Sequence, residues 1–114
     1  RALGEVPPGA EVTVYFGAWC PDSRREVPRL WRALEEAGGD VPFTVEYIAL
    51  DRDFEAGDVD ISGDDVDFVP TFVVHRDGKE VGRIVESAPD RLERDLHALL
   101  TGDEKGVLSG RSDL

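Results

Sequence analysis

One stretch decides the fold: VTVYFGAWCPDS, residues 12–23. Its first five residues, Val12 to Phe16, favour a buried β-strand because they are apolar on both faces apart from Thr13. Pro21 then opens a helix, since proline suits the first helical turn, where its missing N–H is not needed. Cys20 lies at the junction. A thiol at a helix N-terminus faces unpaired N–H groups, which favour the thiolate, so the stretch predicts a nucleophilic sulfur.

The elements on either side of this stretch alternate between strands and helices. The helix is predicted over residues 21–37, ending at Gly38-Gly39, and a second buried strand over 43–50, which together make a right-handed βαβ unit with parallel strands. Residues 68–75 and 80–85 predict a hairpin around Asp77-Gly78. A last helix is predicted with Ser87 as its cap and Gly102 at its end. The order β-α-β-loop-β-β-α indicates an α/β fold with helices on both faces of a mixed sheet.

The helix over 21–37 has a clear apolar stripe. Its members Val27, Leu30, Trp31 and Leu34 recur at i, i+3, i+4 and i+7, so all four, Trp31 included, are expected to pack in the core. Pro28 lies within this pattern and is expected to kink the helix, because its ring removes one backbone hydrogen bond.

The chain of 114 residues is expected to form a single domain, 1–114, with its core in 11–101. Residues 1–10 are expected to be an irregular lead-in and 102–114 a polar tail. Residues 51–67 are predicted to be a long loop, since they hold eight acidic residues against the single base Arg52.

Charge and composition exclude several classes of partner. The formal net charge of −12 would repel nucleic acid and anionic membrane surfaces, and no apolar stretch approaches the length of a membrane span. We expect a soluble, cytoplasmic protein with no cofactor. No metal is expected either: residues 58–63 match only the first half of a calcium loop, and His75 and His97 lack ligands at a suitable spacing.

Three features of the sequence resemble those of the thioredoxin superfamily. They are Trp19-Cys20-Pro21-Asp22-Ser23 before a proline-containing helix, Val69-Pro70-Thr71 at the start of the third strand, and the hairpin that follows. In detail, residues 11–101 resemble bacterial thioredoxin-family proteins with a Trp-Cys-x-Asp-Ser site. The resemblance implies a thioredoxin-like fold, with a central sheet built from a parallel βαβ unit and a C-terminal antiparallel hairpin.

The resemblance also implies a site around Cys20. It implies a cis Val69–Pro70 bond beside the sulfur, a Val69 backbone that pairs with an extended peptide, and an apolar rim of Trp19, Pro21 and Pro70. Asp22 belongs to the same candidate substrate-binding surface. The negative charge of its carboxylate disfavours the Cys20 thiolate, whereas the positive charges of Arg24 and Arg25 favour it. Whether the three charges together favour the thiol or the thiolate stays open.

Two residues depart from the thioredoxin pattern. Thioredoxins keep a second cysteine where this chain has Ser23, and a buried aspartate where it has Val14. The Ser23 hydroxyl is expected to donate a hydrogen bond to the Cys20 sulfur, but it cannot resolve a mixed disulfide. The sequence therefore predicts monothiol (CxxS) exchange with protein thiols or disulfides, with glutathione or a partner thiol as the resolving group.

Other readings of the same residues remain open. The main alternative is a redox-inactive binding module that keeps the thioredoxin surface. Two lesser ones are peroxide chemistry at Cys20, and an iron–sulfur cluster held by Cys20 and glutathione. The protein is expected to be a monomer or a dimer linked through Cys20.

Overall fold

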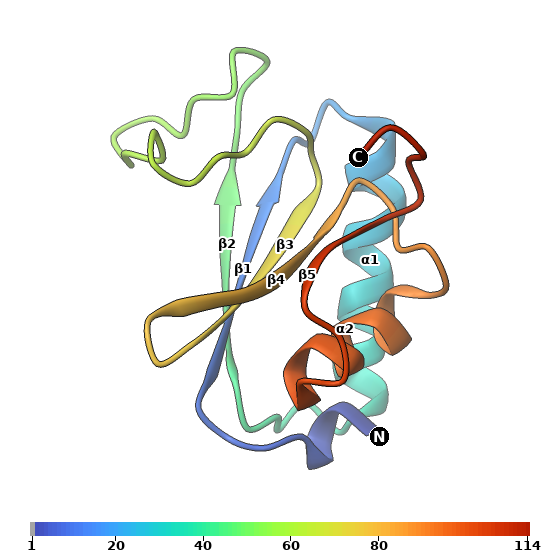
Figure 1. The fold of residues 1–114 in the computed structure, drawn as a ribbon. Helices are drawn as coiled ribbons and strands as arrows, with labels where there is room; N and C mark the ends of the chain where they lie inside the picture. Colours follow the sequence, from blue (N-terminus) through green and yellow to red (C-terminus); the bar gives the residue numbers. More distant parts are fainter. Residues whose placement is uncertain (1) are drawn as a thin grey trace.

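The computed structural model describes residues 2–114 and centres on a five-stranded mixed sheet (Figure 1). A short 3₁₀ helix, η1 (Ala2–Glu5), precedes the sheet. The strands are β1 (Ala10–Phe16), β2 (Thr44–Ala49), β3 (Thr71–Arg76), β4 (Lys79–Val85) and β5 (Gly106–Ser109), and the helices are α1 (Pro21–Glu36) and α2 (Leu92–Thr101).

The strand order is β2-β1-β3-β4-β5, which places β1 and β3 in the interior of the sheet. β1 pairs in parallel with β2 and antiparallel with β3, as the βαβ unit and the hairpin require. The hairpin turns at Asp77-Gly78, both at positive φ (56° and 77°), as predicted for that pair. The second strand predicted over 43–50 is present as β2, but it is an edge strand whose own side chains are exposed or half-buried. The predicted burial is therefore wrong for the strand itself and right only at the flanking Phe43 and Leu50.

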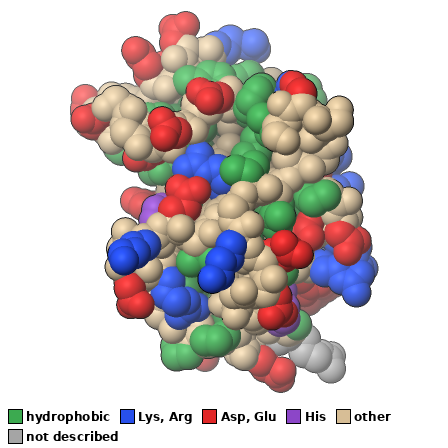
Figure 2. All heavy atoms as spheres, viewed as in Figure 1, with side chains coloured by type: hydrophobic (Ala, Val, Ile, Leu, Met, Phe, Trp, Pro, Cys, Tyr) green, Lys and Arg blue, Asp and Glu red, His purple; other side chains and the backbone are tan. Residues whose placement is uncertain are grey.

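The expectation of helices on both faces is also wrong. α1, α2 and η1 pack on one face, over the strand residues Val12, Val14, Phe72 and Val74. The opposite face is covered by the irregular loop 51–67, whose apolar side chains pack against Tyr15 and Val73. Acidic side chains gather over this loop (Figure 2). The loop is rich in acids and glycines and has few apolar residues, so it lacks the apolar periodicity of an amphipathic helix. This face of the sheet is therefore covered by a loop and not by a helix.

The polar tail predicted over residues 102–114 instead contains β5, which pairs in parallel with β4. Gly82 permits this pairing, because a Cβ there would lie 2.4 Å from the Gly106 carbonyl oxygen. Ser87 does not cap the last helix. The N-cap is Arg91, and the Asp95 carboxylate accepts a hydrogen bond from the Asp90 N–H at 3.0 Å just before the helix.

The buried side of α1 is rotated slightly from the predicted stripe. Val27 and Leu30 are buried as expected, and Ser23, Glu26 and Ala33 join them. The core role predicted for Trp31 is wrong: 55% of Trp31 is exposed, and its ring packs edge-on against Tyr47 of the edge strand β2.

Candidate functional site

The turn between β1 and α1 places Cys20 at the first residue before the helix. The Cys20 N–H donates to the Gly17 carbonyl at 2.9 Å, which closes the turn, and the Cys20 carbonyl accepts from Arg24 N–H at 3.0 Å, which begins the helix. Cys20 is the N-cap of α1 and makes no side-chain capping bond in the part of the chain that is described. The first-turn N–H groups of Asp22 and Ser23 therefore lack a side-chain cap and point toward the end of the helix where the sulfur lies.

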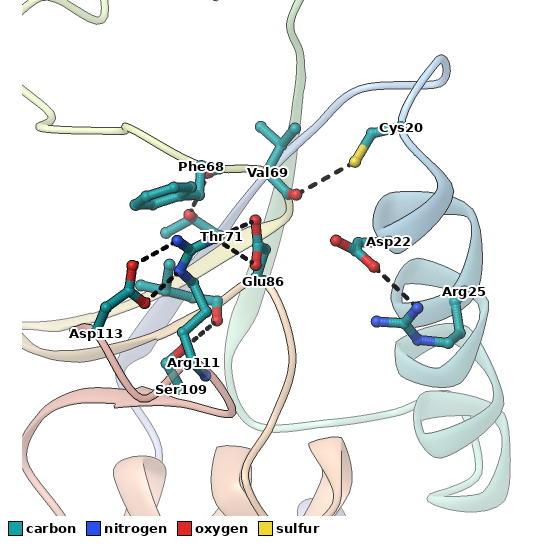
Figure 3. A network of polar contacts seen from close by, with 11 residues as sticks. Cys20, Asp22, Arg25, Phe68, Val69, Thr71, Glu86, Ser109, Arg111 and Asp113 are labelled. Atoms are coloured by element: carbon teal, nitrogen blue, oxygen red, sulfur yellow. Dashed lines mark hydrogen bonds and ion pairs between the residues drawn. The ribbon is translucent and has the colours of Figure 1, made fainter.

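The sulfur of Cys20 lies against the neighbouring loop. Its thiol donates to the Val69 carbonyl oxygen at an Sγ–O distance of 3.4 Å (Figure 3). The Val69–Pro70 peptide bond is cis, and it leads directly into β3. Cys20 is only 9% exposed, so its sulfur is largely closed to solvent. Packing with Trp19, Val69 and Leu50 covers most of it.

Ser23 has a different role from the predicted one. Its hydroxyl oxygen accepts a hydrogen bond from the Gly17 N–H at 3.1 Å, and the residue is buried. Within residues 2–114, no hydrogen bond joins Ser23 to the Cys20 sulfur. Ser23 thus fixes the turn that carries the thiol, because a buried N–H needs a partner.

The three apolar groups predicted around the sulfur are not equally accessible. Pro21 is exposed, Trp19 is half-buried and Pro70 is buried. The Trp19 ring is held in place, since its Nε1–H donates to the Leu50 carbonyl at 2.9 Å and its face lies 5.4 Å from the Arg52 guanidinium. The accessible apolar surface beside the turn is therefore provided by Pro21 and part of Trp19.

Asp22 carries the nearest charge in sequence to the sulfur. Its carboxylate forms an ion pair with Arg25 at 2.9 Å, one turn along α1 (Figure 3). Both side chains are substantially exposed. The pair places a positive charge beside the Asp22 carboxylate at the start of α1, where solvent screens both groups.

A buried carboxylate on α1 was not foreseen from the sequence. Glu26 is 2% exposed and accepts hydrogen bonds from Arg25 and Arg29, both at 3.0 Å through Oε2. Its Oε1 has no partner among the described atoms. The only sequence signal is its position three residues after Ser23 and four before Leu30, on the buried side. Val14, where thioredoxins have an aspartate, is fully buried in the core.

The sequence also offered no reason to single out Glu86 and Arg111. The Glu86 N–H donates to the Pro70 carbonyl at 2.8 Å, and the Glu86 carboxylate accepts from Arg111 at 3.1 Å (Figure 3). Arg111 also hydrogen-bonds to Asp113, and this holds the pKa of the Asp113 carboxyl below its usual range. No local motif predicts the contact between Arg111 and Glu86, because it joins residues that are 25 positions apart.

A second set of hydrogen-bonded residues lies on the face covered by the loop 51–67. The Tyr15 hydroxyl donates to Asp64 at 2.7 Å, and Arg83 donates to the backbone carbonyls of Asp64 and Asp65. Burial raises the pKa of Tyr15 above its usual value, and the hydrogen bond to Asp64 adds to the shift. This phenol is a structural link between β1 and the loop.

The Tyr15 link should make stability fall at alkaline pH. Because the pKa of Tyr15 is raised on folding, its contribution is complete below the unfolded value of about 10 and is lost as pH rises beyond it. We expect Tyr15→Phe to lower the free energy of unfolding by about 1 kcal/mol at pH 8. Denaturant titrations from pH 8 upward should show this difference shrinking above about pH 10. A difference that stays constant would contradict the assignment.

Residues 2–114 hold no helix suited to span a membrane and no cluster of metal-ligand side chains. Neither helix in this range is long and apolar enough to cross a bilayer. The same residues contain no group of three or more His, Cys, Asp or Glu side chains arranged to hold a metal ion.

The architecture is that of the thioredoxin fold. Solved structures that it resembles include Trxlp from Edwardsiella tarda (TM-score 0.61, 19% identity, covering 88% of this chain and 87% of that one). They also include thioredoxin from Fasciola hepatica (0.54, 24%, covering 84% and 82%) and a mutant thioredoxin from Halobacterium salinarum (0.56, 22%, covering 82% and 73%). No protein-family model matches the sequence. At these identities the likeness defines the fold, and the chemistry must be argued from the site.

Proposed function

We propose that this chain is a monothiol, thioredoxin-like protein that exchanges disulfides through Cys20. The observation that carries the proposal is the contact between the Cys20 sulfur, at the N-terminus of α1, and the carbonyl of Val69, just before cis-Pro70. A backbone segment in contact with a sulfur can hold a substrate disulfide in line for attack. The bacterial thioredoxin-family proteins with a Trp-Cys-x-Asp-Ser site remain the proposed relatives.

The proposed reaction has two steps. The Cys20 thiol loses its proton to solvent, and the thiolate attacks a substrate disulfide R–S–S–R′, forming Cys20–S–S–R and releasing R′–S⁻, which takes up a proton. An external thiol, glutathione or a partner cysteine, then attacks the sulfur of R in the mixed disulfide. The external thiol and R form a new disulfide, and Cys20 leaves as a thiolate and takes up a proton. Each step exchanges one sulfur for another, so no net oxidation of the protein occurs.

The surroundings support this role for Cys20. The uncapped N–H groups of Asp22 and Ser23 and the helix dipole favour a negative sulfur. The Val69 N–H makes no backbone hydrogen bond among residues 2–114, so pairing with an extended peptide would break none. Pro21 and Trp19 offer the apolar contacts, and Asp22 the polar one, beside the substrate sulfur. Ser23 supports the turn and does not resolve the adduct.

The low exposure of Cys20 sets a condition on the mechanism. A substrate must displace the thiol from the Val69 carbonyl before its disulfide can approach the sulfur. The same backbone group would then be released to accept a hydrogen bond from the substrate. Because the resolving step needs an outside thiol, a reducing compartment suits the protein, and we propose the cytoplasm. A Cys20-linked dimer is the adduct expected when the partner is a second copy.

A redox-inactive binding module is the second candidate, favoured by the near-complete burial of the sulfur. In that case the surface around Val69 and Trp19 would bind partners without covalent bonds. The two candidates differ in whether partner capture depends on the thiol.

Restoring a second thiol tests the monothiol proposal. Ser23→Cys places a cysteine three residues after Cys20, where it can attack the mixed disulfide. We expect the adduct with a peptide disulfide to decay at least about tenfold faster than in the wild type, followed by intact mass spectrometry. Ser23→Ala is the matched control, since it removes the same hydroxyl without adding a thiol, and its adduct should persist. Equal lifetimes in Ser23→Cys and Ser23→Ala would overturn the proposal.

A further inference from the structure

The turn that carries Val69 is held on its far side by the C-terminal segment. Ser109, the last residue of β5, and the two residues that follow it run beside the end of β4 (Figure 1). The Ser109 hydroxyl donates to the Val85 carbonyl at 2.7 Å, and the Gly110 N–H donates to the Ser87 carbonyl at 2.9 Å. These two anchors bring the Arg111 side chain to the Val69 turn.

The guanidinium of Arg111 contacts residues on both sides of the Val69 turn. Arg111 donates to the two carboxylate oxygens of Glu86 at 3.1 and 3.3 Å, and its Cζ lies 4.2 Å from the centroid of the Phe68 ring (Figure 3). A planar guanidinium suits this arrangement because it can stack on a ring while its edge binds a carboxylate. Phe68 directly precedes Val69, so Arg111 restrains the residue next to the docking backbone.

Glu86 links Arg111 to Pro70, at the other end of the turn. Its backbone has φ = +67°, a left-handed conformation that residues other than glycine adopt at a cost. In this conformation its N–H donates to the Pro70 carbonyl at 2.8 Å. Within the described chain, Arg111 is the one partner of the Glu86 carboxylate. The ion pair therefore helps to hold a backbone geometry that glycine would adopt unaided.

We propose that Arg111 is a positioning residue for substrate docking: through Glu86 and Phe68 it fixes the Val69 backbone against which an extended peptide disulfide binds. The inference rests on the proposed exchange function. It predicts selectivity, because a peptide disulfide needs the Val69 backbone whereas a small disulfide needs only the sulfur. Arg111 would thus set the preference for peptide substrates without touching the reacting sulfurs.

Two disulfide probes separate docking on the Val69 backbone from reaction at the Cys20 sulfur. We expect Arg111→Ala to slow adduct formation with a linear peptide disulfide by about tenfold and to change the rate with hydroxyethyl disulfide less than about twofold. Asp113→Asn is the control, since it weakens the exposed ion pair of Arg111 but leaves the pair with Glu86, and both its rates should stay within about twofold of wild type. Equal slowing of both probes by Arg111→Ala, or no slowing of either, would overturn the proposal.

A rescue variant tests the route through Glu86. Glycine adopts φ = +67° without help, so adding Glu86→Gly to Arg111→Ala should recover most of the lost peptide rate. Amide hydrogen exchange gives a readout that does not depend on Cys20 chemistry. The amide of residue 86 should lose protection in Arg111→Ala and regain it in the double variant, with the amides of β1 and β3 unchanged. Unaltered protection at residue 86 in Arg111→Ala would contradict the positioning role, even if Cys20 proved unreactive.

Discussion

Replacing Cys20 with serine should abolish the covalent capture of disulfide partners that we propose. Cys20 is the single cysteine of the chain, so no other side chain can form a mixed disulfide. The expected loss is complete, because a serine hydroxyl at the same position is neither a thiolate nor a leaving group toward sulfur. Capture of partners from a lysate by immobilised protein, followed by elution with dithiothreitol and mass spectrometry, measures the effect.

The same experiment separates the two candidate functions. Partners eluted by reductant from wild type should be missing from Cys20→Ser, while the fold stays intact by circular dichroism. If both proteins hold the same partners and release them with salt alone, the chain is a binding module and the exchange proposal fails. Ser23→Ala serves as the matched control, since it alters the same turn but keeps the thiol.

Leu30→Ala should cause the largest loss of stability. Leu30 is completely buried on α1, in the cluster that joins the helix to the central strands. Removing its three outer carbons loses the burial of those atoms and leaves a cavity, which together cost about 2–5 kcal/mol. That is a large share of the roughly 5–15 kcal/mol typical of a small domain. Thermal unfolding should show the Tm falling by about 10 °C or more.

Leu114→Ala is the control for Leu30→Ala, because the same atoms are removed where 56% of the residue is already exposed. Its free energy of unfolding should stay within about 0.5 kcal/mol of wild type. Similar losses for the two variants would mean that α1 does not pack on the sheet as described.

Residues near one another in sequence allowed most of the fold to be predicted. The stripe of Val27 and Leu30 defined α1, the strand-forming run after Glu11 defined β1, and Asp77-Gly78 defined the hairpin, since each pattern is local. The resemblance to thioredoxins agreed with the fold that the structure shows.

The parts that were missed depend on distant residues. β5 is four residues long and becomes a strand only because β4 offers an open edge and Gly82 lets Gly106 approach. Trp31 continues the apolar period of α1, but it packs against Tyr47 of the edge strand β2 and stays exposed. The sequence pattern contains no information on which strand lies at an edge. For the same reason the coverage of the second face by a loop was not foreseen.

The sequence signals of the candidate site concern Cys20 and Pro70, and none of them concerns the residues that support the turn. Cys20 and Pro70 carry local signals, a helix N-terminus and a strand-opening proline. The Ser23 hydroxyl found a nearer partner in the Gly17 N–H, so the hydrogen bond expected to the sulfur did not form. Arg111 and Glu86 meet across the sheet edge, a contact that only the position of β5 creates.

The most direct measurement of the central claim is the intact mass of the wild-type protein during incubation with a peptide disulfide. The account predicts one added peptide thiol per chain, attached at Cys20, that persists without reductant and is removed by glutathione. Folded wild-type protein that gains no mass under these conditions, while unfolded protein does, would show that the sulfur is closed to substrates and would contradict the account.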